Sequence, residues 1–256
     1  MPVPFPRKPE SAMSDPAARL YVTDALAAGG SAALTPGQVH YLRHVLRLGA
    51  GARIEVFNGR DGAWAAEPAF SGKGRAEARL LERTCAQRVV PDLWLLFGPV
   101  KSARLDMAVE KATELGVAVL QPVLTEYTQC RRVNLARMQA RAVEAAEQSG
   151  RLSVPEVREP VSLAALLAAW PAGRRLWHCD ETGGGAPALA AFREAEPGAG
   201  DAILIGPEGG FSPREVDLLR AAPFSYPVGL GPRILRAETA AIAALALWQA
   251  VLGDGR

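Results

Sequence analysis

The chain has 256 residues, and 49% of them are hydrophobic, which is enough for a packed core in one large domain or two modest ones. The 29 Lys and Arg against 27 Asp and Glu leave a formal charge of +2, which neither requires nor excludes a nucleic-acid partner. The three cysteines are odd in number and far apart, which argues against a disulfide framework and suits a reducing cytoplasm: Cys85, Cys130 and Cys179.

The amino-terminal segment 1–18 is rich in proline and polar side chains. It contains no apolar run of the kind that forms a signal peptide or a membrane span. We therefore expect residues 1–18 to be a disordered extension of a soluble, cytoplasmic protein that has no membrane partner.

Residues 19–88 have the pattern of a small β-rich domain. Strand-like segments alternate with a strong turn signal, Asn58-Gly59-Arg60-Asp61-Gly62; they are 19–22, 53–57, 64–67 and 76–80. Between them, Pro36 to Leu48 predicts one amphipathic helix whose apolar residues share a face: Val39, Leu42, Val45 and Leu46. Arg43 and Arg47 fall one turn apart on the opposite side of this helix.

His40 and His44 lie four residues apart on the same predicted helix, a spacing that can ligate zinc. No third ligand and no general-base glutamate follows in the pattern, so no metal is assigned to the chain. Histidines that are partly buried or that face RNA are the simpler interpretation of this pair.

Near Pro91 the pattern changes to apolar strands that alternate with helices, and we place a domain boundary between Arg83 and Pro91. The predicted strands are 93–98, 117–124 and 175–179, and the predicted helices are 102–116, 134–149, 163–170 and 188–194. Because these strands are continuously apolar, they indicate a mostly parallel sheet that is buried on both faces.

Two Gly-Pro loops near the carboxyl end each join a short apolar strand to a helix. In the first, Gly206 to Gly210 follows the strand 202–205 and precedes a helix with a Ser-x-x-Glu capping box at Ser212. Three glycines in this loop let backbone groups approach a small molecule closely, although an ordinary strand-to-helix turn has the same pattern.

The second loop, Gly231 to Arg236, precedes a helix that begins near Ala237 and stops at Gly253. Residues 240–252 are apolar on nearly every face, so we expect this helix to be buried in the core or in a subunit interface. Three charged residues at its start favour a binding site over mere structural pairing, because unpaired charges are costly to bury: Arg233, Arg236 and Glu238. Common nucleotide motifs fail, since the first loop has no Gly-Lys-Ser/Thr and Ile234 stands where a dinucleotide motif has its third glycine.

Both loops, LIGPEGGFSPREVDLL and LGPRILRAETAAIAAL, resemble the signature segments of SPOUT methyltransferases, most closely the ribosomal RNA small subunit methyltransferase E family. The segments GPVKSARLDMAVEKATELGV and EQSGRLSVPEV also resemble that family, and RLYV, HYLRHVLRL and VFNGRDG resemble its PUA-like RNA-binding domain. The resemblance implies an α/β fold with a SPOUT-type mostly parallel sheet and a carboxyl-terminal trefoil knot in 91–256, preceded by a PUA-like β-barrel in 19–88. One departure is Thr125-Glu126-Tyr127-Thr128, where an Arg-Ser ending is expected after the glutamate.

The resemblance implies methylation of uridine N3 in 16S ribosomal RNA, free or in the assembled small subunit, with S-adenosyl-L-methionine as the cofactor and a homodimer as the assembly. We assign to the cofactor the backbone of 205–210 and 230–235. The candidate cofactor-binding residues are Ile205, Gly206, Glu208, Gly210, Leu230, Gly231, Ile234, Leu235, Arg236 and Thr239. Arg236 is assigned to the uridine anion or to pocket architecture, Glu238 to orienting Arg236, and Glu208 to an alternative acid–base role. Candidate phosphate contacts, each of which could also be a solvated basic residue, are Arg19, Arg43, Arg47, Arg53, Lys101, Arg131 and Arg132.

Three other functions stay open at this stage. A related knotted methyltransferase acting on a different RNA would share both loops. A non-catalytic RNA-binding protein would not need the paired Gly-Pro loops. A metal-dependent hydrolase would use His40 and His44.

Overall fold

The computed structural model describes residues 16–49, 51–72, 74–196 and 200–255, and most of the segment expected to be disordered lies outside this range. The chain forms two compact units. The first comprises Met1–Val89 with Ala146–Val154, and the second Val90–Ala145 with Pro155–Arg256. Within the described ranges no helix has the length and apolar character needed to cross a membrane.

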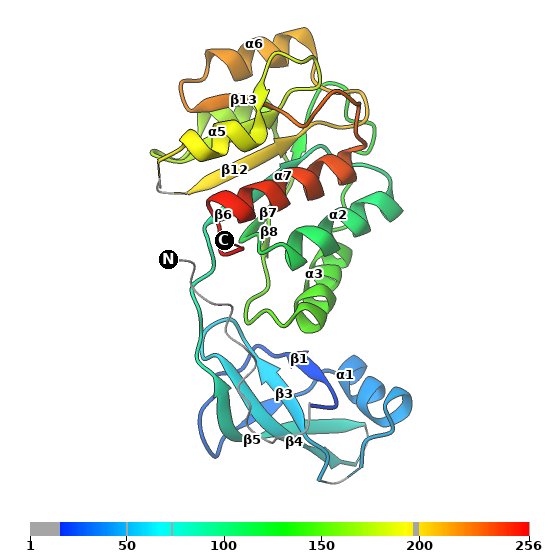
Figure 1. Ribbon diagram of the computed structural model, residues 1–256. Helices are drawn as coiled ribbons and strands as arrows, with labels where there is room; N and C mark the ends of the chain where they lie inside the picture. Colours follow the sequence, from blue (N-terminus) through cyan, green and yellow to red (C-terminus); the bar gives the residue numbers. More distant parts are fainter. Residues whose placement is uncertain (1–15, 50, 73, 197–199, 256) are drawn as a thin grey trace. The chain divides into compact units, whose positions relative to one another are not determined.

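The first unit contains a five-stranded sheet in the order β1-β3-β4-β5-β2 (Figure 1). Its strands are β1 (Arg19–Tyr21), β2 (Ser31–Ala33), β3 (Ile54–Phe57), β4 (Ala63–Ser71) and β5 (Arg75–Cys85). Only β1 and β3 run parallel among the pairs of this sheet, and register shifts between β4 and β5 mark a bulge. Bulges bend and twist a ladder, and the sheet is the curled half-barrel predicted as PUA-like.

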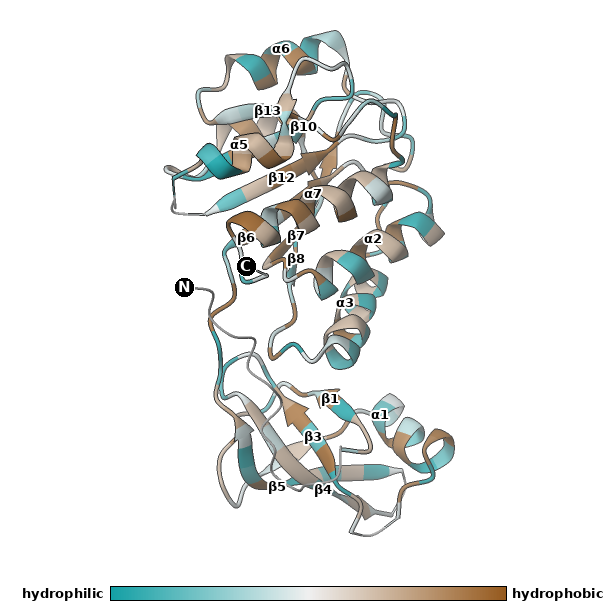
Figure 2. Ribbon diagram, viewed as in Figure 1, coloured by the Kyte–Doolittle hydropathy of each residue, from teal (hydrophilic) through white to brown (hydrophobic). Residues whose placement is uncertain are grey.

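The core of this sheet comes from alternate residues of its strands, which Figure 2 shows as hydrophobic along β3. Leu20, Ile54, Val56, Ala78 and Leu80 are all buried there. Alternation places every second side chain of a strand on one face, which accounts for the burial of these residues. The sequence analysis did not predict β2, a short strand of small residues.

The predicted helix Pro36–Leu48 is present but changes its geometry halfway. It consists of α1 (Pro36–His40) followed by one π-helical turn, η1 (Tyr41–Val45). In that turn the amide of Leu46 donates to the carbonyl of Tyr41 at 2.9 Å, a bond to the fifth residue back. The wider turn rotates the following side chains, so Val45 is 60% exposed instead of lying on the buried face. The placement of Val45 in the apolar face was therefore wrong.

The segment Ala146–Val154 joins the first unit through Arg19. The guanidinium of Arg19 pairs with Glu55 at 2.6 Å and donates at 3.1–3.3 Å to three carbonyl oxygens of the segment, those of Ala146, Glu147 and Arg151. These carbonyls lie at and just after the end of α3 (Leu135–Ser149), where helix carbonyls need partners. Our domain limits placed this segment in the second domain, because the pattern of one helix gives no sign that its end packs elsewhere.

The second unit is built on an eight-stranded sheet whose main path runs β11-β13-β10-β12-β6-β7-β8. All its pairs are parallel, as predicted. Its strands are β6 (Leu93–Phe97), β7 (Val119–Leu124), β8 (Glu156–Val157), β9 (Val161–Ser162), β10 (Arg175–Cys179), β11 (Ala186–Pro187), β12 (Asp201–Ile205) and β13 (Ser225–Gly229). The last strand, β13, lies between two earlier strands, β11 and β10, which no local pattern could have indicated.

Helices cover this sheet on both faces. Besides α3 they are α2 (Ser102–Glu114), α4 (Leu163–Ala168), α5 (Ala188–Glu194), α6 (Pro213–Ala221) and α7 (Ala237–Val251). The last helix, α7, packs against α2, α5 and β12 (Figure 1). The short helix α4 packs against α6 and β7. Ala244, Leu245 and Trp248 of α7 are buried, but Ala246 and Ala250 are exposed, so the helix is buried on one side.

Asp201, at the start of β12, is a buried carboxylate that ties α7 to the sheet. It accepts hydrogen bonds from the indole N–H of Trp177 at 3.0 Å and of Trp248 at 2.9 Å, and pairs with Arg175 at 2.7 Å. A buried charge is tolerated where it is paired and fully hydrogen-bonded. This network fixes β10, β12 and α7 relative to one another, and the loops that follow β10 and β12 carry the candidate site.

Candidate cofactor-binding site

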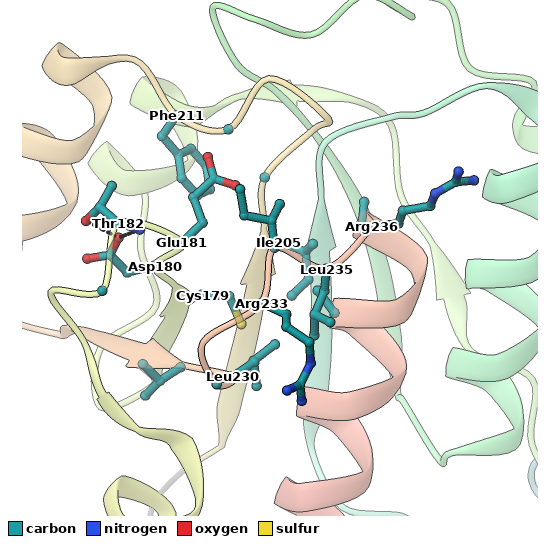
Figure 3. Close-up of a pocket in the computed structure, with 18 of the residues that line it drawn as sticks. Cys179, Asp180, Glu181, Thr182, Ile205, Phe211, Leu230, Arg233, Leu235 and Arg236 are labelled. Atoms are coloured by element: carbon teal, nitrogen blue, oxygen red, sulfur yellow. Dashed lines mark hydrogen bonds between the residues drawn. The ribbon is translucent and has the colours of Figure 1, made fainter.

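A cavity of about 470 Å³ opens at the carboxyl ends of three adjacent strands, β13, β10 and β12 (Figure 3). Its walls are the loops that follow these strands, with lining residues in 179–183, 205–211 and 228–237, and Ala240 of α7. Ligands bind at the carboxyl ends of parallel strands because the loops meet there and side chains do not fill the space. The two Gly-Pro loops, separate in the sequence, thus share one cavity.

The predicted cofactor residues, with one exception, line this cavity: Ile205, Gly206, Glu208, Gly210, Leu230, Gly231, Ile234, Leu235 and Arg236. The exception is Thr239, which is exposed and lies beyond the cavity wall. It lies in the first turn of α7, whose inward face is turned to the cavity at Ala240 instead. Neighbouring residues of a helix point about 100° apart. Thr239 therefore faces away from the cavity, although Ala240, one residue later, lines it.

The third wall, residues 179–183 at the end of β10, has no counterpart among the predicted site residues. This loop carries a thiol and two carboxylates, Cys179, Asp180 and Glu181, next to a run of three glycines. A strand followed by acidic residues and glycines was a usable signal. What could not be read from it was that β10 lies between β12 and β13.

Burial and hydrogen bonding set the ionisation of this third wall. Burial raises the pKa of the Cys179 thiol to about 12, so the thiol stays protonated. Burial alone would raise the pKa of Asp180 too, but hydrogen bonds from the amide and hydroxyl of Thr182, at 2.8 and 2.6 Å, and the nearby His178 and Arg220 lower it. Asp180 is therefore a fixed negative charge beside a neutral thiol.

Glycines shape the cavity where a side chain would close it. Gly210 has a φ of +67°, and a Cβ there would run into the Glu181 carboxylate. Gly231 has a φ of +105°, a conformation that other residues rarely adopt. The remaining lining combines apolar side chains with carboxylates, which suits a small molecule that has an apolar part and polar or cationic groups: Ile205, Phe211, Val228, Leu230, Leu235, Asp180, Glu181 and Glu208.

Arg104 of α2 links the two glutamates that the sequence analysis proposed for the chemistry. Its Nη1 lies 3.3 Å from Glu208 Oε1, and its Nε lies 3.8 Å from Glu238 Oε1. Glu238 is 7% exposed, and its Oε2 has no hydrogen-bond partner in the part of the chain that the structure describes. The pairing of Glu238 with Arg236 is therefore replaced by a pairing with Arg104, which the sequence analysis did not consider.

Arg236 and Arg233 both line the cavity and are exposed. In Figure 3 the guanidinium of Arg236 extends away from Ile205 and Leu235, off the start of α7. As the residue that precedes the helix, Arg236 is held by its backbone, whose carbonyl accepts from the Ala240 amide at 2.8 Å. Its side chain is thus exposed at the mouth of the cavity, with the guanidinium directed away from the lining.

The predicted RNA contacts differ in how available their charges are. Lys101, Arg131 and Arg132 of the second unit are exposed, as are Arg43 and Arg47 of the first. The Arg43 guanidinium lies 4.9 Å from the ring of Phe70, and Arg47 follows the π-helical turn at a φ of +54°. Arg53 is only loosely paired, 3.9 Å from Glu82. Arg19 is the exception, since Glu55 and three carbonyls occupy its guanidinium; we withdraw it as a phosphate contact.

The rings of His40 and His44 lie 4.9 Å apart. No group of three or more metal-ligating side chains occurs among residues 16–49, 51–72, 74–196 and 200–255. The pair therefore gives no support to the hydrolase alternative.

Comparisons with known proteins agree with this geometry. Residues 88–249 match the family described as RNA methyltransferase domain, and residues 34–81 match the RNA methyltransferase PUA domain. The chain is 31% identical over 229 residues to the ribosomal RNA small subunit methyltransferase E of Rickettsia conorii, covering 89% of this chain and 93% of that protein. It is 35% identical over 223 residues to the protein of the same name from Synechocystis sp., covering 86% and 73%.

A solved structure gives the same picture. The crystal structure of a ribosomal RNA small subunit methyltransferase E from Neisseria gonorrhoeae, bound to S-adenosyl methionine, matches with a TM-score of 0.81 at 31% identity. The match covers 93% of this chain and 99% of that chain. The similarity thus extends over both units.

Proposed function

Because the chain belongs to the ribosomal RNA small subunit methyltransferase E family, we propose that it methylates N3 of a uridine in 16S ribosomal RNA, with S-adenosyl-L-methionine as the methyl donor. The observation that carries the proposal is the cavity that both Gly-Pro loops build together at the carboxyl ends of β12 and β13. Ribosomal RNA as substrate also places the enzyme in the cytoplasm.

The residues that line the cavity fit this cofactor. Its volume of about 470 Å³ is in the range of small-molecule sites. Apolar side chains such as Leu230 and Leu235 suit the adenine ring, and the carboxylates of Asp180 and Glu181 suit hydroxyl groups and a cationic amine. When bound, the cofactor supplies an electrophilic methyl group on a positively charged sulfur.

Uridine N3 sets two requirements on the protein. It lies on the Watson–Crick edge, so the base must be unpaired or flipped out of its stack. It also carries a proton, so N3 must lose that proton as it gains the methyl carbon, while the electron pair of the broken carbon–sulfur bond stays on sulfur. An acceptor for the proton and a cation for the developing anion are therefore needed.

We assign these two tasks to the charged residues at the mouth of the cavity. Glu208, which lines the cavity and is 36% exposed at its side chain, is positioned to take the proton. Arg236 stabilises the charge that develops on the uracil oxygens. Glu238 is nearly buried, so its task is to hold Arg104, which in turn holds Glu208.

The RNA is proposed to contact exposed cations on each unit. In the first unit these are Arg43, Arg47 and Arg53, and in the second Lys101, Arg131 and Arg132. Contacts to phosphates make the affinity depend steeply on salt concentration. Removing one contacting cation should lower the slope of log affinity against log salt concentration by about one. The PUA-type unit, residues 19–88 in our assignment, thus serves to bind RNA and the unit from residue 91 onward to modify it.

The assembly is proposed to be a homodimer whose chains are each knotted at the carboxyl end. Ala246 and Ala250 of the largely apolar helix α7 are exposed. These two residues support a subunit contact, since small side chains let another helix approach closely. Insertion of β13 between β11 and β10 supports the threaded path. A monomer in light scattering at micromolar concentration would remove the dimer from the proposal.

The test of the reaction is incubation of the purified protein with S-adenosyl-L-methionine and small ribosomal subunits from a strain that lacks the gene. Digested nucleosides are then analysed by mass spectrometry, with a reaction that lacks S-adenosyl-L-methionine as the control. We expect 3-methyluridine that is absent without protein. If the protein binds the cofactor but no 3-methyluridine forms on subunits or on naked 16S RNA, the proposed substrate is wrong and a different RNA must be the target.

A further inference from the structure

The turn at residues 125–128, directly after β7, is fixed from within. The hydroxyl of Thr128 accepts a hydrogen bond from the Thr125 amide at 2.9 Å, and the two hydroxyl groups lie 2.9 Å apart. The Thr128 amide donates to the Thr125 carbonyl at 3.2 Å, which closes the turn. Both threonines are buried, 3% and 5% exposed. The turn is thus a rigid element and not a mobile loop.

A buried carboxylate locks this turn to the first Gly-Pro loop. Glu215 of α6 accepts from the Glu126 amide at 2.9 Å with one oxygen, and from the Ser212 amide at 2.9 Å with the other. Glu215 is the capping-box residue of α6, so the same side chain ends the glycine loop and holds the turn. The positions of the two segments are therefore coupled.

Tyr127 is the residue that this fixed turn presents to solvent. It is 44% exposed between the two buried threonines, and its hydroxyl and ring make no hydrogen bond or ring contact with the described residues. Its Cβ packs on Gly209, where an added Cβ would lie only 3.1 Å away. One side of the ring rests near Gly209, since an added Cβ there would lie 3.6 Å from the ring atom Cγ. An aromatic ring on a locked backbone loses little conformational entropy when something stacks on its exposed part.

The Tyr127 side chain lies against the first Gly-Pro loop, at Gly209. Gly209 lies between Glu208 and Gly210, both of which line the cavity. Glu208 is in turn held by Arg104. Tyr127 and Arg104 therefore flank the glutamate to which we assign the proton transfer.

We propose that Tyr127 is a stacking platform for an unpaired base of the RNA substrate, at the mouth of the cofactor cavity. The inference rests on the proposed RNA substrate, and it assigns to this residue a contact that positions the substrate base. An aromatic ring binds the face of any base without reading its edges, which leaves the Watson–Crick edge of a flipped uridine free to react.

The test uses two measurements on the full-length protein: the KM and kcat for unmodified small ribosomal subunits, and the Kd for a short single-stranded oligouridylate. The variants are Tyr127→Phe, which keeps the ring, Tyr127→Leu, which keeps apolar bulk, and Tyr127→Ala. The matched control is Tyr226→Ala, which removes a tyrosine of similar exposure, 42%, on β13. Affinity for S-adenosyl-L-methionine checks that each variant is folded.

Loss of stacking predicts that Leu and Ala raise both the KM and the oligouridylate Kd by about 5- to 150-fold. In Tyr127→Phe and in the Tyr226→Ala control, both values should stay within about twofold of wild type, because each variant keeps an aromatic ring at position 127. Equal effects of Phe and Leu, or a Leu variant with wild-type KM and Kd, would overturn the inference. If Ala also loses cofactor affinity, the comparison of Phe with Leu still decides.

The oligouridylate arm separates this inference from the proposed reaction. If wild-type protein forms no 3-methyluridine but binds oligouridylate in a ring-dependent way, the proposed function fails and the stacking platform stands. If 3-methyluridine forms equally well with Tyr127→Leu at limiting subunit concentration, the reaction stands and the platform is rejected.

Discussion

Arg104→Ala removes the cation that pairs with both Glu208 and Glu238. The Arg104–Glu208 pair is about one-third exposed on both sides, so it stabilises the fold by only about 0.2–1 kcal/mol. Glu238 is 9% exposed at its side chain, and stripping the partner from a buried carboxylate costs about 3–5 kcal/mol when the pair is fully buried. The cost is smaller here, because Arg104 is itself 36% exposed. Glu238 also lies in the first turn of α7, where the helix dipole stabilises a carboxylate by about 0.3–1 kcal/mol.

We therefore expect Arg104→Ala to lower the free energy of unfolding by about 1–3 kcal/mol, which corresponds to a Tm lower by roughly 2–12 °C for a chain of this size. The double variant Arg104→Ala with Glu238→Gln should recover most of that stability, because it removes the unpaired charge. It should not recover activity. The kcat for methylation should fall at least about tenfold in both variants, since Glu208 loses the group that positions it.

Thermal denaturation and methyl transfer to small ribosomal subunits measure the two effects separately. Cofactor affinity should stay within about twofold, because Arg104 does not line the cavity. Lys111→Ala is the control on the same helix, since it breaks exposed pairs with Glu110 and Glu114 and should change stability by less than about 0.5 kcal/mol. Wild-type kcat and Tm in Arg104→Ala would refute the role of this residue.

Three further outcomes follow from single groups. Arg236→Ala should reduce methylation strongly; full activity with unchanged cofactor affinity would exclude the role we give this arginine. Burial lowers the pKa of His178 below its ordinary value of 6.5, so the unfolded chain binds the proton more readily and stability falls as the pH drops below about 6.5. Urea denaturation at about pH 5 and pH 7.5 should show this loss, and a His178→Gln variant should show a smaller one. Ser212→Ala should cost about 1 kcal/mol and roughly 2–4 °C in Tm through loss of the α6 cap, whereas Ser212→Thr, which keeps the capping oxygen without adding a charge, should lose less.

Local signals in the sequence located most of the second unit well. The strand 175–179 and the helix 188–194 occur as predicted, and Ser212 with Glu215 forms the predicted capping box. These features depend on residues within a few positions of one another, so the sequence contains the whole cause. The π-helical turn at Tyr41–Val45 shows the limit, because one hydrogen bond shifted by a single residue moves Val45 to the surface without any change in pattern.

Contacts between side chains that are far apart in the sequence could not be predicted from local patterns. Arg104 and Glu208 are 104 positions apart, and they meet only because α2 packs against α7 beside the loop after β12. Arg19 was proposed for phosphate, yet its guanidinium lies against carbonyls 127 to 132 positions away. In the sequence, an arginine that caps a distant helix cannot be told from one whose guanidinium is free.

The sequence by itself was enough to predict most strands of the parallel sheet, the two Gly-Pro loops and the family that these loops resemble. The tertiary structure alone decided that β10 lies between β12 and β13, and so that a third loop, 179–183, completes the cavity. The reason is physical: strand identity is set by local side-chain pattern, whereas strand order is set by how the whole sheet buries its faces.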